Sequence, residues 1–280
     1  MTTLCEDDVI VRCFNCNQSD FTTSSWLSFG AITLIRCKTC GILHLFPIQM
    51  HDDGAESLSV QESRRQMGLA MDDDPTGFNH GNGILDLAEN YKKGGRLLDV
   101  GCKHGELLMA ARTRGWDPVG LDINASFCDV AREKGFEVYN TVVEKLRPDI
   151  KKFNLIILSH VLEHIQRPDI TLQALREQLD SKGLMYVETP DVSSPIAWGV
   201  YRGRWLGVTT PGHVWAFTSK TLQNVISNLG FEVIWTNNWI PYAPHDYPKT
   251  LKGQTRRVLF TAINKIGMGD ILGVLARKID

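Results

Sequence analysis

Two acidic residues and two glycines give residues 97–122 of this 280-residue chain their chemical character. Asp99 lies in an apolar run that leads into a turn containing Gly101 and Gly105, and Asp122 ends the next apolar run. Glycines let a backbone approach a ligand closely, and an acid at the second strand end suits a bidentate hydrogen bond to ribose hydroxyls. The spacing favours a site for an adenosine-containing cofactor, although an ordinary strand-to-helix turn would give a similar pattern.

The glycine spacing also separates two kinds of adenosine cofactor. A dinucleotide site carries G-x-G-x-x-G, so that a pyrophosphate can lie on the helix N-terminus. Lys103 and Glu106 occupy the second and third glycine positions here, and the Glu106 carboxylate would oppose a pyrophosphate. The pattern therefore disfavours a dinucleotide.

The elements expected around this turn alternate between apolar strands and amphipathic helices, which is typical of a doubly wound α/β sheet. Residues 155–158 form a continuous apolar run, as expected of a strand buried on both faces, and Ser159 and His160 follow it. Farther along the chain we expect a strand over 231–237, a helix near 251–266 and a final strand over 271–275. Ligands of such sheets bind beyond the carboxyl ends of the strands.

Three motifs resemble those of class I methyltransferases that use S-adenosylmethionine (SAM). The first is D-x-G-x-G-x-G, which this chain matches except that Lys103 replaces the middle glycine. The second is LEH…P, formed by Leu162, Glu163, His164 and Pro168. The third is the block GHVWAFTSKTLQNVISNLGFEV at 212–233. The resemblance covers about residues 85–236. Within the class, the chain is similar in particular to methyltransferases of sugar and polysaccharide biosynthesis.

This resemblance implies a fold and a cofactor site. The expected fold is a doubly wound, seven-stranded, Rossmann-like methyltransferase sheet that ends in an antiparallel hairpin. Asp99 would face the ammonium of SAM and Asp122 its ribose. The expected cofactor-binding residues are Asp99, Gly101, Cys102, Gly105, Asp122, Ile123, Val143, Ser159 and His160.

Four of the seven cysteines have the spacing of a metal site. Cys13 and Cys16 form one C-x2-C pair, and Cys37 and Cys40 form the other. Two such pairs can give four thiolates to one tetrahedral zinc ion with no open position, which makes the expected zinc structural. The second pair resembles the knuckle of zinc ribbons that precede some SAM methyltransferases. The alternative is four unligated cysteines.

Methyl transfer to an oxygen, nitrogen or carbon that must lose a proton benefits from a base, and three histidines, at positions 160, 164 and 213, are candidates. His160 follows a strand at the cofactor edge, but its side chain could instead cap a turn. His213 lies in a loop rich in tryptophan and glycine that could stack on a sugar ring or form core. The acid–histidine pair Glu163-His164 is interpreted as packing at a helix start, although some quinone-pathway relatives use such a pair for a divalent ion.

The charge and the hydropathy of the chain argue against nucleic-acid and membrane partners. Thirty Lys and Arg against 32 Asp and Glu leave a net charge of −2, so no nucleic-acid partner is expected. The first residues lack a basic and an apolar region, and no apolar run reaches the ~20 residues of a membrane helix, so we expect a cytoplasmic protein without a signal peptide. Oligomeric state is left open.

The expected organisation has three parts. A zinc ribbon occupies 1–48, and a linker with a lid helix occupies 49–83. The SAM methyltransferase domain occupies 84–280, with an insertion near 241–268. Within it, the sequence Gly81-Asn82-Gly83 predicts a loop, followed by a helix over 84–91.

These observations predict methyl transfer to a sugar-type acceptor, either a nucleotide sugar, a glycan or a glycosylated metabolite. One alternative is an RNA methyltransferase with a zinc ribbon. The other is a non-catalytic module with the SAM-binding fold, which only Lys103 supports.

Overall fold

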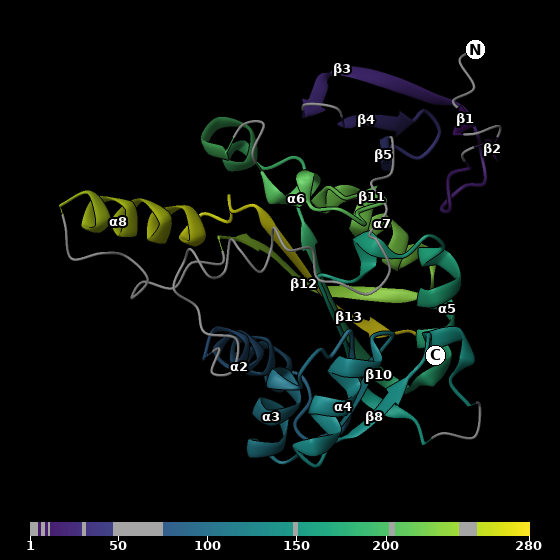
Figure 1. Cartoon of the computed structure of the whole chain (residues 1–280), viewed down its shortest axis with the longest axis vertical. Helices are drawn as coiled ribbons and strands as arrows, with labels where there is room; N and C mark the ends of the chain where they lie inside the picture. Colours follow the sequence, from purple (N-terminus) through teal and green to yellow (C-terminus); the bar gives the residue numbers. More distant parts are fainter. Residues whose placement is uncertain are drawn as a thin grey trace.

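A seven-stranded sheet forms the centre of the computed structural model, which describes residues 5–6, 9–10, 12–29, 32–46, 75–147, 151–201, 205–240 and 251–280 (Figure 1). Its strands are β6 (Gly95–Val100), β7 (Trp116–Asp122), β8 (Glu137–Asn140), β9 (Phe153–Ser159), β10 (Leu179–Pro190), β12 (Phe231–Trp239) and β13 (Ile271–Lys278). Their order is β12-β13-β10-β9-β6-β7-β8, and β13 runs antiparallel to both of its neighbours. The expected doubly wound sheet with a C-terminal antiparallel hairpin is confirmed.

Helices cover both faces of this sheet. They are α2 (Pro75–Glu89), α3 (Glu106–Thr113), α4 (Ala125–Glu133), α5 (Pro168–Gln178), α7 (Ser219–Asn228) and α8 (Leu251–Lys265). Shorter elements are η1 (Val143–Lys145), η2 (Leu162–His164), η3 (Ala197–Tyr201) and α6 (Leu206–Thr209). The longer helix α8 lies between β12 and β13 in sequence and extends to one side of the molecule (Figure 1). No helix in the described part of the chain is long and apolar enough to cross a membrane.

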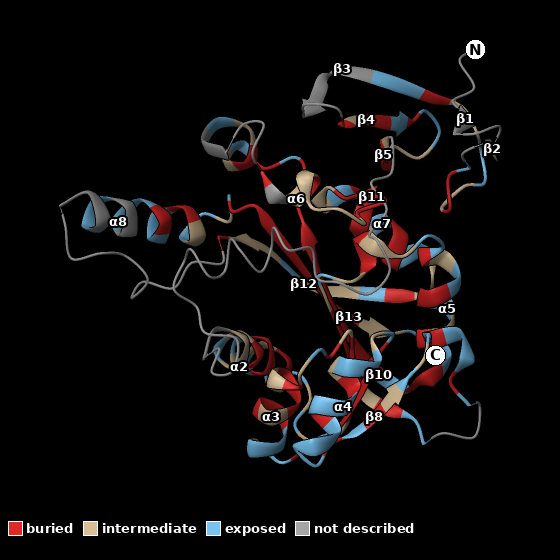
Figure 2. Ribbon diagram, viewed as in Figure 1, coloured by how far each residue is buried: buried red, intermediate tan, exposed pale blue. Residues whose placement is uncertain are grey.

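Successive side chains of a strand point to opposite faces of the sheet, and here both faces pack against helices. Leu155 and Ile157 of β9 pack in one core with residues of α2 and α3. Ile156 and Leu158 pack in the other core, with residues of α5 and α7. The central strands are consequently buried on both sides (Figure 2), as their continuous apolar sequence predicted.

The expectation of a loop at Gly81-Asn82-Gly83 was wrong, because α2 continues through it without a break. A Cβ on Gly81 would lie 3.2 Å from the Cα of Leu107, and one on Gly77 would lie 3.2 Å from the Cβ of Glu106. These glycines therefore permit close packing of α2 on α3, and tertiary contacts offset their low helix propensity. The lid helix expected over 57–71 lies outside the described residues.

A second sheet contains the N-terminal strands β3 (Phe21–Phe29), β4 (Ile32–Cys37) and β5 (Leu43–Phe46). Its fourth strand, β11 (Trp215–Ala216), comes from far along the chain and pairs with β5. The short strands β1 (Cys5–Glu6) and β2 (Val9–Ile10) pair with each other. The N-terminal cysteine region therefore shares a sheet with the methyltransferase part.

Candidate functional site

The turn between β6 and α3 brings the backbone to the carboxyl edge of the sheet. Gly101 and Gly105 have φ angles of 77° and 85°, which side chains disfavour. A Cβ on Gly101 would lie 2.6 Å from Cγ2 of Val161, in the turn that follows β9. The glycine spacing noticed in the sequence has a steric cause, since the turn must be tight and must lie against the neighbouring strand end.

Asp99 is buried in β6 beside this turn and is only 4% exposed. Its burial, together with the negative charges of Asp122 and Glu106, raises the pKa of Asp99 to about 8, and Lys103 partly opposes this shift. A nearby cation would favour the ionised carboxylate. The position is therefore suited to an ammonium group.

Asp122 ends β7 and is fixed by two backbone amides. Its Oδ2 accepts from the N–H of Lys103 at 3.0 Å, and its Oδ1 accepts from the N–H of Asn124 at 2.8 Å. Each carboxylate oxygen keeps a further lone pair for a ligand. The next residue, Ile123, is 76% exposed and gives an apolar surface beside the carboxylate. Asp122 and Ile123 thus offer a hydrogen-bond acceptor for ribose hydroxyls and an apolar contact for an adenine ring.

Lys103 and Cys102 fill the middle of the turn. Lys103 has a φ of 46°, so it adopts the left-handed conformation that the family pattern reserves for glycine. Its side chain is exposed, while its backbone N–H binds Asp122. Cys102 is buried, and its Sγ lies 2.6 Å from where a Cβ on Gly120 would be. The turn therefore keeps its geometry despite the lysine.

Two further cofactor candidates lie in different surroundings. Val143 is buried in η1 and packs in the apolar core. Ser159 ends β9, and its Oγ donates to Oε1 of Glu188 at 3.2 Å. The structure thus brings Asp122, Asp99 and Ser159 to the carboxyl ends of three adjacent strands, which are β7, β6 and β9 respectively.

Next to this cofactor edge, two histidines approach one buried carboxylate. Oε1 of Glu188 lies 3.1 Å from Nε2 of His160 and 3.0 Å from Nε2 of His80. Oε2 of Glu188 accepts from the hydroxyl of Tyr186 at 2.8 Å. Glu163 also reaches this group, because its Oε1 lies 3.3 Å from Nδ1 of His160. We refer to these residues, with Ser159, as the Glu188 cluster.

Within the Glu188 cluster, histidines balance the negative charge of the buried carboxylates. Burial opposes the charged form of His160, but hydrogen bonds with Glu163 and Glu188 outweigh it and raise the pKa of His160 to about 10. Burial likewise opposes ionisation of Glu188, but contacts with His160 and His80 hold its pKa well below the ordinary value. For Glu163, the contact with His160 similarly outweighs burial and lowers the pKa. The cluster therefore holds two carboxylates and an imidazolium.

Sequence reasoning missed His80, Tyr186 and Glu188 as members of this site. Glu188 had a usable signal, because it is an acid that directly follows the buried run 184–187 near the carboxyl end of its strand. His80 had none, since it lies in the segment interpreted as a linker. Tyr186 is two residues before Glu188 on the same strand, so both face the same side of the sheet.

His213 lies in a second group of polar side chains, with Glu163 and His164. One ligand atom from each of the three lies within 4.8 Å of the others. Nδ1 of His213 lies 3.0 Å from the carbonyl oxygen of Gly207, and it must donate there because a carbonyl only accepts. Oε2 of Glu163 is buried without a hydrogen-bond partner among the described residues. A carboxylate and two imidazoles are a donor set that could hold a divalent cation.

The aromatic residues near His213 are mostly core. Trp205 is 3% exposed and donates through Nε1 to Asp270 at 3.0 Å. Trp215 is 4% exposed and donates through Nε1 to the carbonyl of Gln166 at 3.2 Å. Of the two interpretations left open for this loop, core packing holds for both tryptophans. Arg202, in the same loop, lies outside the described residues.

Cys13, Cys16, Cys37 and Cys40 come together through two copies of one turn. In both, the residue after the second cysteine is left-handed and its N–H donates to the carbonyl of the first cysteine, at 2.7 Å and 2.9 Å. The sulfurs of Cys13 and Cys40 are 3.3 Å apart, and those of Cys16 and Cys37 are 3.5 Å apart. Thiolates around one zinc ion would be about 3.8 Å apart, given Zn–S bonds of about 2.3 Å. The four residues thus fit a tetrahedral zinc site.

The cysteine region is attached directly to the site. β11 pairs with β5 on one side, and on the other the N–H of Val214 donates to the carbonyl of Glu163 at 2.8 Å. Phe14, between the first two cysteines, packs edge-on against Trp215 with ring centroids 4.8 Å apart. The segment that carries His213 is therefore held between the cysteine region and η2.

Comparisons with known proteins agree with this geometry. Residues 81–235 match the family described as "Methyltransferase domain". The chain is 26% identical over 216 residues to the ubiquinone biosynthesis O-methyltransferase of Bartonella quintana, covering 73% of this chain and 71% of the relative. It is 25% identical to the protein of the same name from Bartonella tribocorum, of which it spans 63%.

The fold has solved counterparts. The crystal structure of a SAM-dependent methyltransferase from Archaeoglobus fulgidus superposes with a TM-score of 0.56 at 19% identity, covering 78% of this chain and 99% of that one. At this identity the likeness concerns the fold alone.

The names of the curated relatives overturn the sugar-type acceptor expected from the sequence. They describe O-methylation in quinone synthesis, which is methylation of a small molecule. The motifs behind that expectation carry Asp99, Gly101 and Gly105 of the cofactor turn and the polar side chains Glu163 and His213, and none of these residue types is specific to a sugar. Because the family match covers more than half of the 280 residues, the chain belongs to the methyltransferase domain family and is a SAM-dependent methyltransferase.

Proposed function

We propose that this protein transfers a methyl group from SAM to a hydroxyl oxygen on a small molecule of the quinone-precursor type. The names of the curated relatives support the oxygen acceptor. The observation that carries the proposal is the Glu188 cluster, which collects imidazole, carboxylate and hydroxyl groups beside the cofactor turn. A hydroxyl acceptor must be oriented and must lose a proton, and these are the groups that do both.

The proposed SAM site uses the turn after β6 and the end of β7. Asp99 faces the ammonium, Gly101, Cys102 and Gly105 shape the turn, and Asp122 holds the ribose. Ile123 and Val143 give apolar surface, and Ser159 and His160 border the methyl group. When bound, SAM supplies the electrophilic methyl carbon, so the protein mainly has to position the acceptor.

The acceptor side is proposed to contain His160 and His213. His160 is charged, and a fixed cation near a reacting oxygen stabilises negative charge as it develops. His213 is oriented by donation from Nδ1 to the carbonyl oxygen of Gly207. Both histidines lie after strands or turns at the sheet edge where ligands of this fold bind.

We propose that Cys13, Cys16, Cys37 and Cys40 bind one structural zinc ion. The doubled turn and the distances between sulfurs support this. Four thiolates leave no open coordination position, so this ion would stabilise the ribbon and take no part in methyl transfer. The ribbon is proposed to occupy residues 1–48, with β11 adding one more strand to its sheet.

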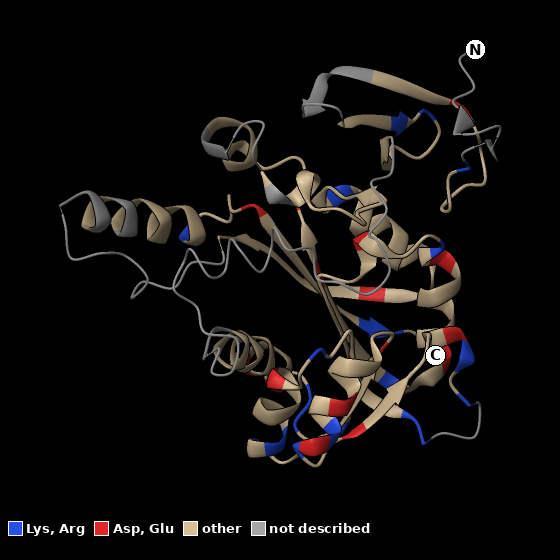
Figure 3. Cartoon of the chain, viewed as in Figure 1, with Lys and Arg blue, Asp and Glu red and all other residues tan. Residues whose placement is uncertain are grey.

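Charge is consistent with a small-molecule acceptor. Around α3, α4 and β8, Lys and Arg residues are interleaved with Asp and Glu (Figure 3). A nucleic-acid site would require basic residues gathered on one face.

The test is methyl transfer to chosen acceptors. Purified protein is incubated with SAM and, separately, with a catechol, a phenol without an adjacent hydroxyl, and an aniline. A gain of about 14 Da on the catechol or phenol, from one methyl replacing hydrogen, supports the proposal. Transfer to the aniline alone, or SAM binding without transfer to any oxygen acceptor, would contradict it.

A further inference from the structure

His80 and His160 share Glu188 but differ in what their second ring nitrogen does. Both place Nε2 against Oε1 of Glu188, at 3.0 Å and 3.1 Å. His160 also places Nδ1 3.3 Å from Oε1 of Glu163. A carboxylate oxygen only accepts, so both ring nitrogens of His160 must carry hydrogens. His160 therefore has no lone pair with which to take a proton.

His80 keeps such a lone pair. Donation from Nε2 to Glu188 fixes the tautomer of a neutral imidazole, and Nδ1 is then the unprotonated nitrogen. No partner for Nδ1 of His80 is found among the residues that the structure describes. The side chain is 36% exposed, whereas Glu188 is 1% exposed. This arrangement of a buried acid, an oriented imidazole and an open nitrogen is that of a general base.

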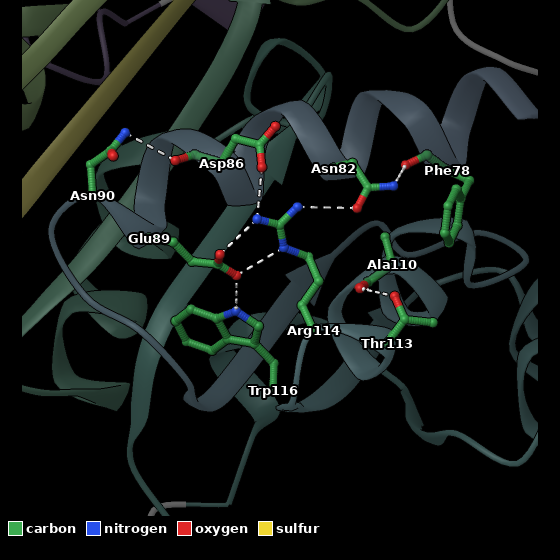
Figure 4. Close-up of polar contacts among 9 residues, drawn as sticks. All are labelled: Phe78, Asn82, Asp86, Glu89, Asn90, Ala110, Thr113, Arg114 and Trp116. Atoms are coloured by element: carbon green, nitrogen blue, oxygen red, sulfur yellow. Dashed lines mark hydrogen bonds and ion pairs between the residues drawn. The ribbon is translucent and has the colours of Figure 1, made fainter.

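The position of His80 is fixed by the packing of α2. Close to its other end, the guanidinium of Arg114 binds Glu89 at 2.6 Å and 2.9 Å and Asp86 at 2.7 Å (Figure 4). Trp116 of β7 also donates to Glu89 at 3.0 Å. Toward the first turns, Gly77 and Gly81 allow α2 to lie close to α3. The helix is thus held at both ends, and His80 is held against the strand ends.

We propose that His80 is the general base of methyl transfer, oriented by Glu188, with His160 as the neighbouring fixed cation. This inference rests on the proposed function. In the proposed step, Nδ1 of His80 takes the proton of the acceptor hydroxyl while the oxygen forms its bond to the methyl carbon. The carbon–sulfur bond of SAM breaks, and its electron pair stays on sulfur. The proton then leaves His80 for solvent.

The first test compares variants with a catechol as the probe acceptor. His80→Gln should lower kcat by about 10²-fold to 10⁴-fold, because it removes proton transfer. The KM for the catechol and the affinity for SAM should change only a few-fold. Asn79→Ala, at an exposed position of the same helix, should leave kcat unchanged. Added imidazole should restore part of the rate of His80→Ala, which a merely structural role would not explain.

The second test does not need turnover. Nitrogen NMR of the free protein, assigned by comparison with His80→Gln, should show His80 near neutral pH with a proton on Nε2 and none on Nδ1. A proton on Nδ1 with Nε2 bare would overturn the proposal. So would a kcat of His80→Gln within a few-fold of wild type, or a large loss in His213→Gln without one in His80→Gln. If wild type methylates no oxygen acceptor, the proposed function fails, and the NMR result still decides the state of His80.

Discussion

The cofactor side and the acceptor side of the sheet edge treat buried acids in opposite ways. On the cofactor side, burial and neighbouring acids raise the pKa of Asp99 to about 8. On the acceptor side, histidines outweigh burial and lower the pKa of both Glu163 and Glu188. The first region has only the exposed Lys103 to oppose its negative charge, whereas in the second region histidines lie directly against the carboxylates. A ligand ammonium therefore belongs beside Asp99, and a neutral acceptor belongs beside Glu188.

The largest effect is expected from loss of the ribbon, which should damage the acceptor side and spare the cofactor side. The ribbon contacts the acceptor side through β5, β11 and Trp215, whereas the glycine turn contacts Val161 in the turn that follows β9. Removal of a structural zinc ion withdraws about 10–16 kcal/mol of binding free energy in zinc-finger peptides. Cys37→Ser should therefore unfold the ribbon, lower the melting temperature and abolish transfer while SAM still binds.

Metal analysis, thermal unfolding and calorimetry with SAM check this prediction. Cys128→Ser, at a buried cysteine outside the ribbon, is the control and should keep the metal. Less than half an equivalent of zinc in wild type would contradict the zinc site. Loss of SAM binding together with the ribbon would show that the two sides are not separable.

The next largest effect concerns the charge balance of the Glu188 cluster. Glu188→Ala leaves two imidazoles without their shared buried carboxylate, and breaking such a buried pair costs about 3–5 kcal/mol of unfolding free energy. Glu232→Ala is the matched control, since its ion pair with Arg277 is exposed and such pairs contribute at most about 1 kcal/mol. Denaturant unfolding measures both. Equal losses in the two variants would refute the claim that the acceptor side depends on internal charge pairing.

On the cofactor side, Asp122→Ala should weaken SAM binding. The loss of a hydrogen bond to a charged group is worth about 1.5–3 kcal/mol, which is roughly a 10-fold to 150-fold rise in Kd. Asp117→Ala tests specificity, because Asp117 is on the same strand but 69% exposed. Calorimetry with SAM gives both values. An unchanged Kd in a folded Asp122→Ala protein would show that the ribose of SAM does not bind at Asp122.

The pH dependence of SAM binding follows from Asp99. Below its pKa of about 8 the carboxyl group of the free protein is protonated, and binding an ammonium then requires release of that proton. Affinity should therefore rise with pH by at most about tenfold per pH unit up to about 8 and then level off. Titrations at several pH values measure this slope, and Asp99→Asn should remove it. Affinity that falls as pH rises toward 8 would show that Asp99 does not face the ammonium.

Much of the cofactor side could be predicted from the sequence because it is local. Asp99, Gly101 and Gly105 belong to one turn, and their spacing reports its backbone geometry directly. The cysteine pairs are equally local, since each turn brings its own two sulfurs together. The apolar runs also predicted the strands of the sheet, because strands buried on both faces leave a continuous signal.

The acceptor side could not be predicted in this way. The Glu188 cluster joins residues 159, 160 and 188 through the pairing of β9 with β10, and the packing of α2 on the sheet adds His80. The glycines of α2 read as a loop, although they serve helix packing, so His80 was not considered. The chain pairing of β11 with β5 is likewise a long-range contact without a local signal.

The smallest effect is expected at Lys103, the residue that departs from the family pattern. A side chain in the left-handed region costs about 1–2 kcal/mol, and glycine in turn loses about 0.5–1 kcal/mol of chain entropy. Lys103→Gly should therefore change the unfolding free energy by at most about 1.5 kcal/mol, toward greater stability. The Kd for SAM should change only a few-fold, because Lys103 holds Asp122 through its backbone N–H, which glycine retains. Gly105→Ala should act in the opposite direction, since its φ is 85° and the added Cβ would lie 3.3 Å from the ring of Phe136. A large change in Kd for Lys103→Gly would mean that the lysine ammonium itself takes part in binding, and that its charge on the cofactor side matters for SAM as well as for Asp99.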